Sequence, residues 1–97
     1  MHLENAERQK IESLAEILKT ISHPARLCIV SGLIREPRRT VNTIQGCLDL
    51  PQSTISQHLA KLKGAGIVNG ERSGLEIRYS VVNEEVIRIV KCLLAEQ

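Results

Sequence analysis

The chain has 97 residues, a formal net charge of +2 and neither Phe nor Trp, with Tyr79 as its single aromatic residue. This length suits one domain spanning residues 1–97, and the composition requires an aliphatic core. The apolar runs are too short to cross a bilayer and the N-terminus lacks the apolar stretch of a signal peptide, so we expect a cytoplasmic protein without a membrane partner.

The charge is unevenly distributed along the chain. Between Arg38 and Arg78 six Lys or Arg residues face three Asp or Glu residues, which gives this region a net charge of +3. A phosphate-binding surface needs such an excess, but an ordinary solvated surface would look similar. Three widely spaced cysteines without a CxxC pair predict free thiols rather than a disulfide scaffold.

Three helices are expected before residue 50. The first spans residues 5–21, with Asn5 as its cap and apolar residues repeating at 11, 14, 15, 18 and 21. The second begins at Ser22 or His23, accepts Pro24 in its first turn and continues to about residue 34. Thr40 caps a short third helix, on which Cys47 is expected to be a small core or boundary residue.

The stretch 50–68 combines a buried stripe with a polar face. Ile55, Leu59 and Leu62 fall on one side of a helix, which Pro51 opens and two glycines close. The opposite side carries hydroxyl, amide and basic groups, which can approach base edges and hydrogen-bond to them. With the preceding short helix this pattern predicts a helix-turn-helix.

A change of period after Gly66 predicts two strands, at residues 67–72 and 75–81, with Ser73-Gly74 as the hairpin tip. Arg72 and Arg78 flank this tip. Such a hairpin would form a wing lying along a phosphate backbone.

The last expected helix, residues 83–94, is apolar on nearly all sides. A domain this small cannot cover it completely. We therefore expect a homodimer formed by the first and last helices, which would suit a palindromic double-stranded operator because each subunit could read one half-site.

These features occur together in the segments LKTISHPARL (18–27), LPQSTISQHL (50–59), GAGIV (64–68) and RSGLEIRYS (72–80). In this order they resemble the ArsR/SmtB family of winged-helix repressors over residues 14–93. The resemblance implies an α+β, mostly α, winged helix-turn-helix with four helices, two strands and a final helix. It also implies a homodimeric repressor.

The DNA-contacting positions follow from two arguments. The resemblance assigns the family's contact motif to Gln52, Ser53, Ser56 and Gln57. The helical wheel adds three positions and the predicted wing adds Arg72 and Arg78; the three wheel positions are Thr54, His58 and Lys61. His58 borders the apolar stripe, so a structural histidine remains equally open.

The resemblance also bears on metals and signals. Thr40 and Asn42 stand where metal-sensing members carry a Cys-x-Cys pair, and residues 82–97 contain no Asp or His, so no metal site or cofactor is expected. Redox-sensing members place one cysteine on the second helix and one on the last, as Cys28 and Cys92 do here. The family's sensor position on the second helix corresponds to Ser31 here, one turn beyond Cys28. Ordinary surface or interface cysteines therefore remain the alternative, and the sequence does not identify the inducer.

Two competing function classes remain. A winged helix can act as a protein-interaction module without direct DNA binding. An enzyme is disfavoured because no nucleophile–base–carboxylate set, carboxylate pair or glycine-rich phosphate loop is visible.

Overall fold

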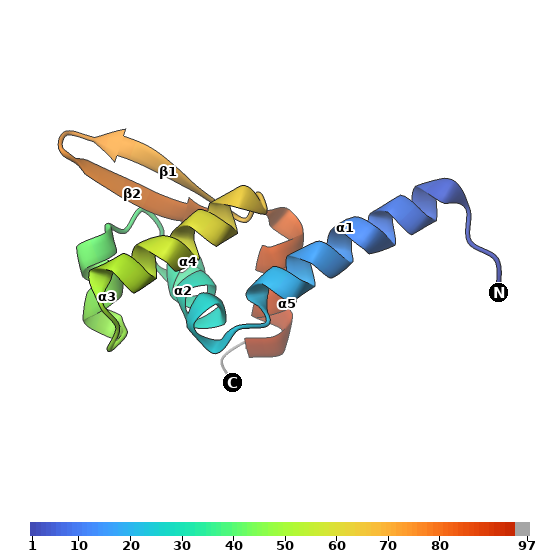
Figure 1. The fold of residues 1–97 in the computed structure, drawn as a ribbon, viewed down its shortest axis with the longest axis horizontal. Helices are drawn as coiled ribbons and strands as arrows, with labels where there is room; N and C mark the ends of the chain where they lie inside the picture. Colours follow the sequence, from blue (N-terminus) through green and yellow to red (C-terminus); the bar gives the residue numbers. More distant parts are fainter. Residues whose placement is uncertain (95–97) are drawn as a thin grey trace.

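The elements follow one another in the order predicted for a winged helix-turn-helix. The computed structural model describes residues 1–94 (Figure 1). Its elements are α1 (Asn5–Ile21), α2 (Pro24–Arg35), α3 (Val41–Cys47), α4 (Gln52–Gly64), β1 (Val68–Ser73), β2 (Glu76–Val81) and α5 (Glu84–Leu94). The α+β, mostly helical fold class is therefore confirmed.

Helix α2 lies at the centre of the fold, in contact with α1, α4, α5 and β2. Its buried residues are Ile29, Val30 and Leu33, and α4 contributes Ile55, Leu59 and Leu62, the stripe expected from the sequence. The remaining buried apolar residues are Ile17, Ile21, Ile44, Ile67, Val68, Val86 and Val90. The core is aliphatic, as the composition requires, and it fixes α4 with its polar side outward.

Polar side chains cap three of the five helices within residues 1–94. The Thr40 hydroxyl accepts from the Thr43 N–H at the start of α3, and His23 caps α2 by accepting from the Ala25 N–H. Asn83 accepts from the Val86 N–H ahead of α5. The expected Asn5 cap is wrong: Glu4 occupies the cap position of α1, without a side-chain hydrogen bond.

The wing is an antiparallel hairpin in which Val68 pairs with Val81 and Ser73 pairs with Glu76. The expected tip was shifted by one residue, because Gly74 and Leu75 form the turn and Gly74 has a φ of +65°. The first strand also starts one residue late. The Ile67 N–H donates to the Leu62 carbonyl at 2.9 Å and so closes the end of α4 before the strand begins.

Helix α1 projects from the rest of the fold, and the whole molecule measures 50 Å along its longest axis (Figure 1). Only its C-terminal part is buried, through Ile17 and Ile21, whereas Ile11 and Leu18 of the predicted stripe are 52% and 41% exposed. Cys47 is exposed, contrary to the expected core or boundary position.

No single helix within residues 1–94 is long and apolar enough to span a membrane. Helices α1 and α2 taken together are long and apolar enough by length and composition alone, but the angle between them is 99°.

Candidate nucleic-acid interface

The exposed face of α4 carries most of the predicted base-reading side chains. Gln52, Ser53, Ser56, Gln57 and Lys61 are exposed, and Thr54 is half-buried. None of these side chains makes a hydrogen bond or ion pair within residues 1–94. Amide and hydroxyl groups in this state keep their full capacity to donate and accept. The face is therefore available to a polar partner.

The position of α4 is set by the turn after α3. Gln45 donates from Nε2 to the Leu50 carbonyl at 3.2 Å, which holds this turn against α3. The Pro51 carbonyl accepts the Thr54 and Ile55 N–H groups at 3.0 and 3.1 Å and so starts α4. Because Ile44 and Ile55 are both buried, the two helices share the core and present one rigid helix-turn-helix.

His58 belongs to a cluster behind the exposed face. Its ring lies 4.7 Å from the His23 ring, and its Nδ1 is 3.5 Å from Nη1 of Arg26, which also donates from Nε to the Thr20 carbonyl at 2.6 Å. Burial lowers the pKa of His58, and His23, Arg26 and Lys61 lower it further through their charges. A neutral imidazole accepting from Arg26 fits this geometry, which favours the structural role over a phosphate contact.

The two wing arginines differ in their surroundings. Arg72 is exposed near the tip and has no ion pair or hydrogen bond from its side chain within residues 1–94. Arg78 is half-buried, donates from Nη1 to the Arg38 carbonyl at 3.2 Å, and lies 3.7 Å from a Glu76 carboxylate oxygen. Arg72 is thus free to meet a phosphate, whereas Arg78 is partly engaged within the protein.

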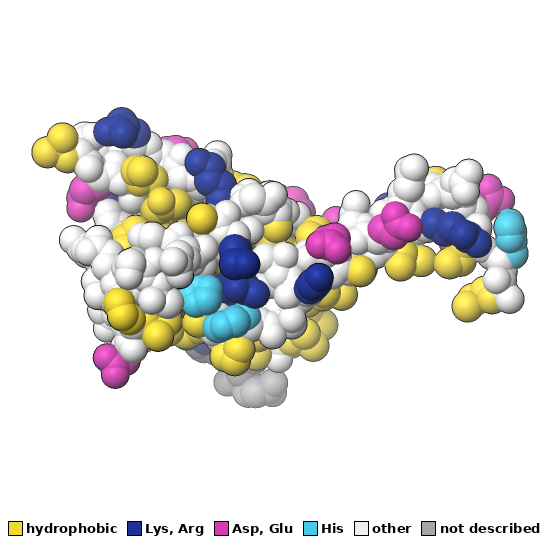
Figure 2. Space-filling view, in the orientation of Figure 1, with side chains coloured by type: hydrophobic (Ala, Val, Ile, Leu, Met, Phe, Trp, Pro, Cys, Tyr) yellow, Lys and Arg dark blue, Asp and Glu magenta, His cyan; other side chains and the backbone are white. Residues whose placement is uncertain are grey.

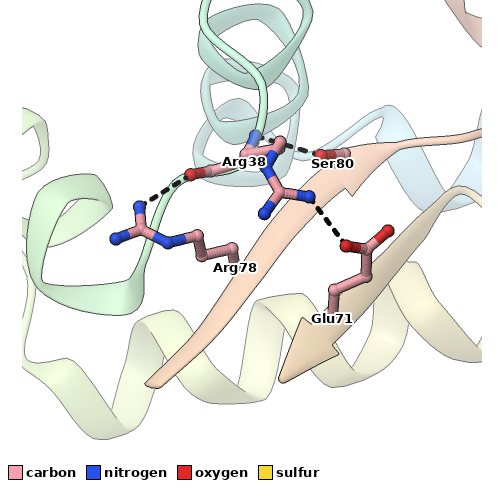
Figure 3. A network of polar contacts seen from close by, with 4 residues as sticks. All are labelled: Arg38, Glu71, Arg78 and Ser80. Carbon is pink, nitrogen blue, oxygen red and sulfur yellow. Dashed lines mark hydrogen bonds and ion pairs between the residues drawn. The ribbon is translucent and has the colours of Figure 1, made fainter. Parts of the chain in front are cut away.

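The loop between α2 and α3 is tied to the wing by polar contacts that no local sequence pattern predicts (Figure 3). Arg38 donates from Nη1 to a Glu71 carboxylate oxygen at 2.7 Å, and its backbone N–H donates to the Ser80 hydroxyl at 3.0 Å. The next residue, Arg39, pairs with Tyr79 of β2 through two backbone hydrogen bonds of 2.8 and 3.1 Å. We call Arg38, Glu71, Arg78 and Ser80 the loop–wing network.

The network requires an unusual backbone conformation. Arg38 has a φ of +63°, and it is the one residue other than glycine within residues 1–94 with a positive φ. This conformation disfavours side chains with a Cβ, so the surrounding contacts must hold it in place.

Comparison with known proteins identifies the architecture. A family model described as a helix-turn-helix domain matches residues 21–71. The transcriptional repressor PagR of Bacillus anthracis is 46% identical over 87 residues, which cover 90% of this chain and 87% of PagR. The repressor SmtB of Mycobacterium tuberculosis is 40% identical over 83 residues, which cover 86% of this chain and 61% of SmtB. This chain belongs to the ArsR/SmtB family.

The three-dimensional likeness agrees with this assignment. The crystal structure of PagR superposes with a TM-score of 0.81 at 45% identity and covers 89% of this chain and 98% of that one. Reduced HlyU from Vibrio cholerae superposes with a TM-score of 0.87 at 27% identity and covers 97% and 100% of the two chains. The expected resemblance to ArsR/SmtB repressors is confirmed.

The cysteines of this ArsR/SmtB protein occupy three exposed positions, on α2, α3 and α5. Cys28 and Cys47 line the same groove between α2 and α3, and Cys92 is on α5. Within residues 1–94 no group of three or more His, Cys, Asp or Glu side chains is arranged to hold a metal ion.

Proposed function

We propose that this ArsR/SmtB protein represses transcription by binding a palindromic operator as a homodimer. The observation that carries the proposal is the exposed face of α4, whose amide and hydroxyl side chains have no partner within the described part of the chain. An α-helix fits the major groove, where such side chains distinguish base pairs. The free Arg72 beside it on the wing suits a phosphate contact.

Apolar surface on α1 and α5 supports the homodimer. A groove between these helices is lined almost entirely by apolar side chains, including Leu18 and Leu93, which are 41% and 75% exposed. Hydrophobic side chains also follow one edge of the projecting part of α1 (Figure 2). Covering this surface with a second copy removes it from water and sets two α4 helices in a two-fold arrangement. Such an arrangement requires two equivalent half-sites on the DNA.

DNA binding distinguishes this proposal from a protein-interaction module. We expect the affinity for an operator fragment to fall steeply with salt, because phosphate contacts release counterions. Replacement of Gln52 by Ala is expected to cost about 1–3 kcal/mol of operator binding and to relax base preference. Arg72→Ala should weaken operator and random DNA alike and reduce the salt slope by about one.

The control is Asn69→Ala, an exposed β1 position outside these sets. Fluorescence anisotropy over a salt series, together with light scattering to establish the oligomeric state, tests the proposal. Unchanged operator affinity of Gln52→Ala would show that α4 does not read the bases, and a monomer at micromolar concentration would refute the two-fold arrangement.

A further inference from the structure

A groove with a volume of about 240 Å³ lies between α2 and α3 and is mostly apolar. Ile29 and Leu33 line it from α2, and Ile44 and Leu48 line it from the α3 side. Gly32 also lines the groove, and a Cβ added at Gly32 would meet no atom within 4 Å. Gly32 is exposed, so a side chain here would extend into open space at the edge of the groove.

Gly32 is an unfavourable residue for its position. It lies inside α2, where Gly is worse than Ala because it loses more backbone freedom on folding. Its φ is not positive and no neighbour excludes a methyl group, so the packing and backbone do not require glycine. What glycine provides here is room in the groove.

The end of the groove nearest the loop is polar and carries a net positive charge. Arg35, Glu36 and Arg39 line it, and an Arg39 Nη2 atom lies 3.3 Å from a Glu36 carboxylate oxygen. The Arg39 Nε–H is buried and has no hydrogen-bond partner within residues 1–94. An unsatisfied buried donor of this kind costs stability, and an acceptor oxygen at this end of the groove would relieve the cost after a small rotation of the side chain.

We propose that the groove between α2 and α3 binds a small aliphatic carboxylate. The hydrocarbon chain would lie over Ile29, Leu33 and Ile44 in the space beside Gly32, and the carboxylate would accept from Arg39. A guanidinium–carboxylate contact is a strong, charge-assisted hydrogen bond, and the apolar walls supply the burial that a chain of several carbons needs.

The groove is connected to both elements of the proposed DNA interface. One of its walls is α3, the first helix of the helix-turn-helix, and Arg39 is bonded through its backbone to Tyr79 of the wing. An occupant can therefore shift α3 and β2 relative to α2. An effect of the carboxylate on operator affinity rests on the proposed function, whereas its binding does not.

The cysteines supply a test that needs no DNA. Cys28 and Cys47 line the groove, and Cys92, which is also exposed but lies on α5, is an internal control. The full chain is treated with iodoacetamide, with and without octanoate below its micelle-forming concentration, and the alkylation of each cysteine is followed by mass spectrometry. At ten times its Kd, octanoate should slow alkylation of Cys28 and Cys47 about tenfold and leave Cys92 unchanged.

Two ligand controls and two variants define the site. Acetate lacks the apolar chain and octylamine carries the opposite charge, so neither should protect. Gly32→Leu fills the groove and Arg39→Gln removes the guanidinium, and each should abolish protection by octanoate; circular dichroism establishes that both variants are folded. The proposal would be overturned if octanoate changed the alkylation rates of all three cysteines by the same factor or not at all. Protection by octylamine as strong as by octanoate would overturn it as well. Protection without any change in operator affinity would keep the site and remove only its link to DNA binding.

Discussion

The loop–wing network allows the cost of the Arg38 backbone conformation to be separated from the value of its ion pair. Arg38→Ala and Arg38→Gly both remove the ion pair with Glu71, which is worth about 0.2–1 kcal/mol because both side chains are more than half exposed. Only the glycine variant also relieves the left-handed conformation, which costs a residue with a Cβ about 1–2 kcal/mol. Glycine loses about 0.5–1 kcal/mol of this gain through its greater freedom in the unfolded chain.

Arg38→Gly should therefore be more stable than Arg38→Ala by about 0.5–1 kcal/mol and close to the unchanged protein. The hydrogen bond from the backbone of residue 38 to Ser80 is kept in both variants, so the comparison isolates the conformation. Urea denaturation at one fixed protein concentration measures the difference, since the stability of a dimer depends on concentration. Glu71→Gln, which loses the ion pair alone, is the matched control. Equal stability of the alanine and glycine variants would refute a strained Arg38 in solution.

Three further predictions concern α3, α4 and the histidine cluster. Ile55→Ala should destabilise the fold by about 2–5 kcal/mol because Ile55 is fully buried, whereas exposed Gln57→Ala should stay within about 0.5 kcal/mol, both by urea denaturation. Thr40→Ala should lower the free energy of unfolding by about 1 kcal/mol because the α3 cap is lost, whereas Thr40→Ser keeps the capping hydroxyl and should lose much less. Equal losses in the two variants would show that the methyl group of Thr40 matters instead. The pKa of His58 in the folded protein is below its unfolded value of about 6.5, so the unfolded chain binds more protons at acidic pH. The contribution of His58 to the free energy of unfolding should therefore be fully present above pH 6.5 and be lost as the pH falls through the folded pKa. Denaturation at pH 7.5 and 5 checks this, and His58→Gln should flatten the dependence.

The elements that depend on local pattern could be predicted from the sequence. The stripe of Ile55, Leu59 and Leu62 is periodic, so it identified the buried side of α4 and, by exclusion, its polar face. Thr40 could be recognised as a cap because its hydroxyl acts on a residue three positions later. The predicted burial of the apolar stripe on α1 was wrong in part, because the N-terminal part of that helix projects beyond the rest of the fold (Figure 1). Periodicity there does not imply burial.

The parts that could not be predicted depend on contacts between distant residues. Arg38 meets Glu71 and Ser80, 33 and 42 positions away, and no local spacing announces such a pair. The groove with Cys28 and Cys47 depends on how α2 and α3 diverge after their loop, which periodicity does not determine. Arg78 illustrates the consequence: its place beside the hairpin tip suggested a phosphate contact, but the structure also engages it with the Arg38 carbonyl.

The loop between α2 and α3 therefore has a second role besides connecting two helices. Helix α4 and the wing are neighbours in the chain, and the buried Ile67 and Val68 hold the base of the hairpin in the core. Farther along the hairpin, Arg39 holds β2 through its backbone bonds to Tyr79, and Arg38 adds contacts with Glu71 and Ser80. Both contacts start from the residues between the central helix and the helix-turn-helix. We therefore expect a change in the angle between α2 and α3 to reach α4 and the wing together, so that a ligand in the groove between α2 and α3 needs no contact with either.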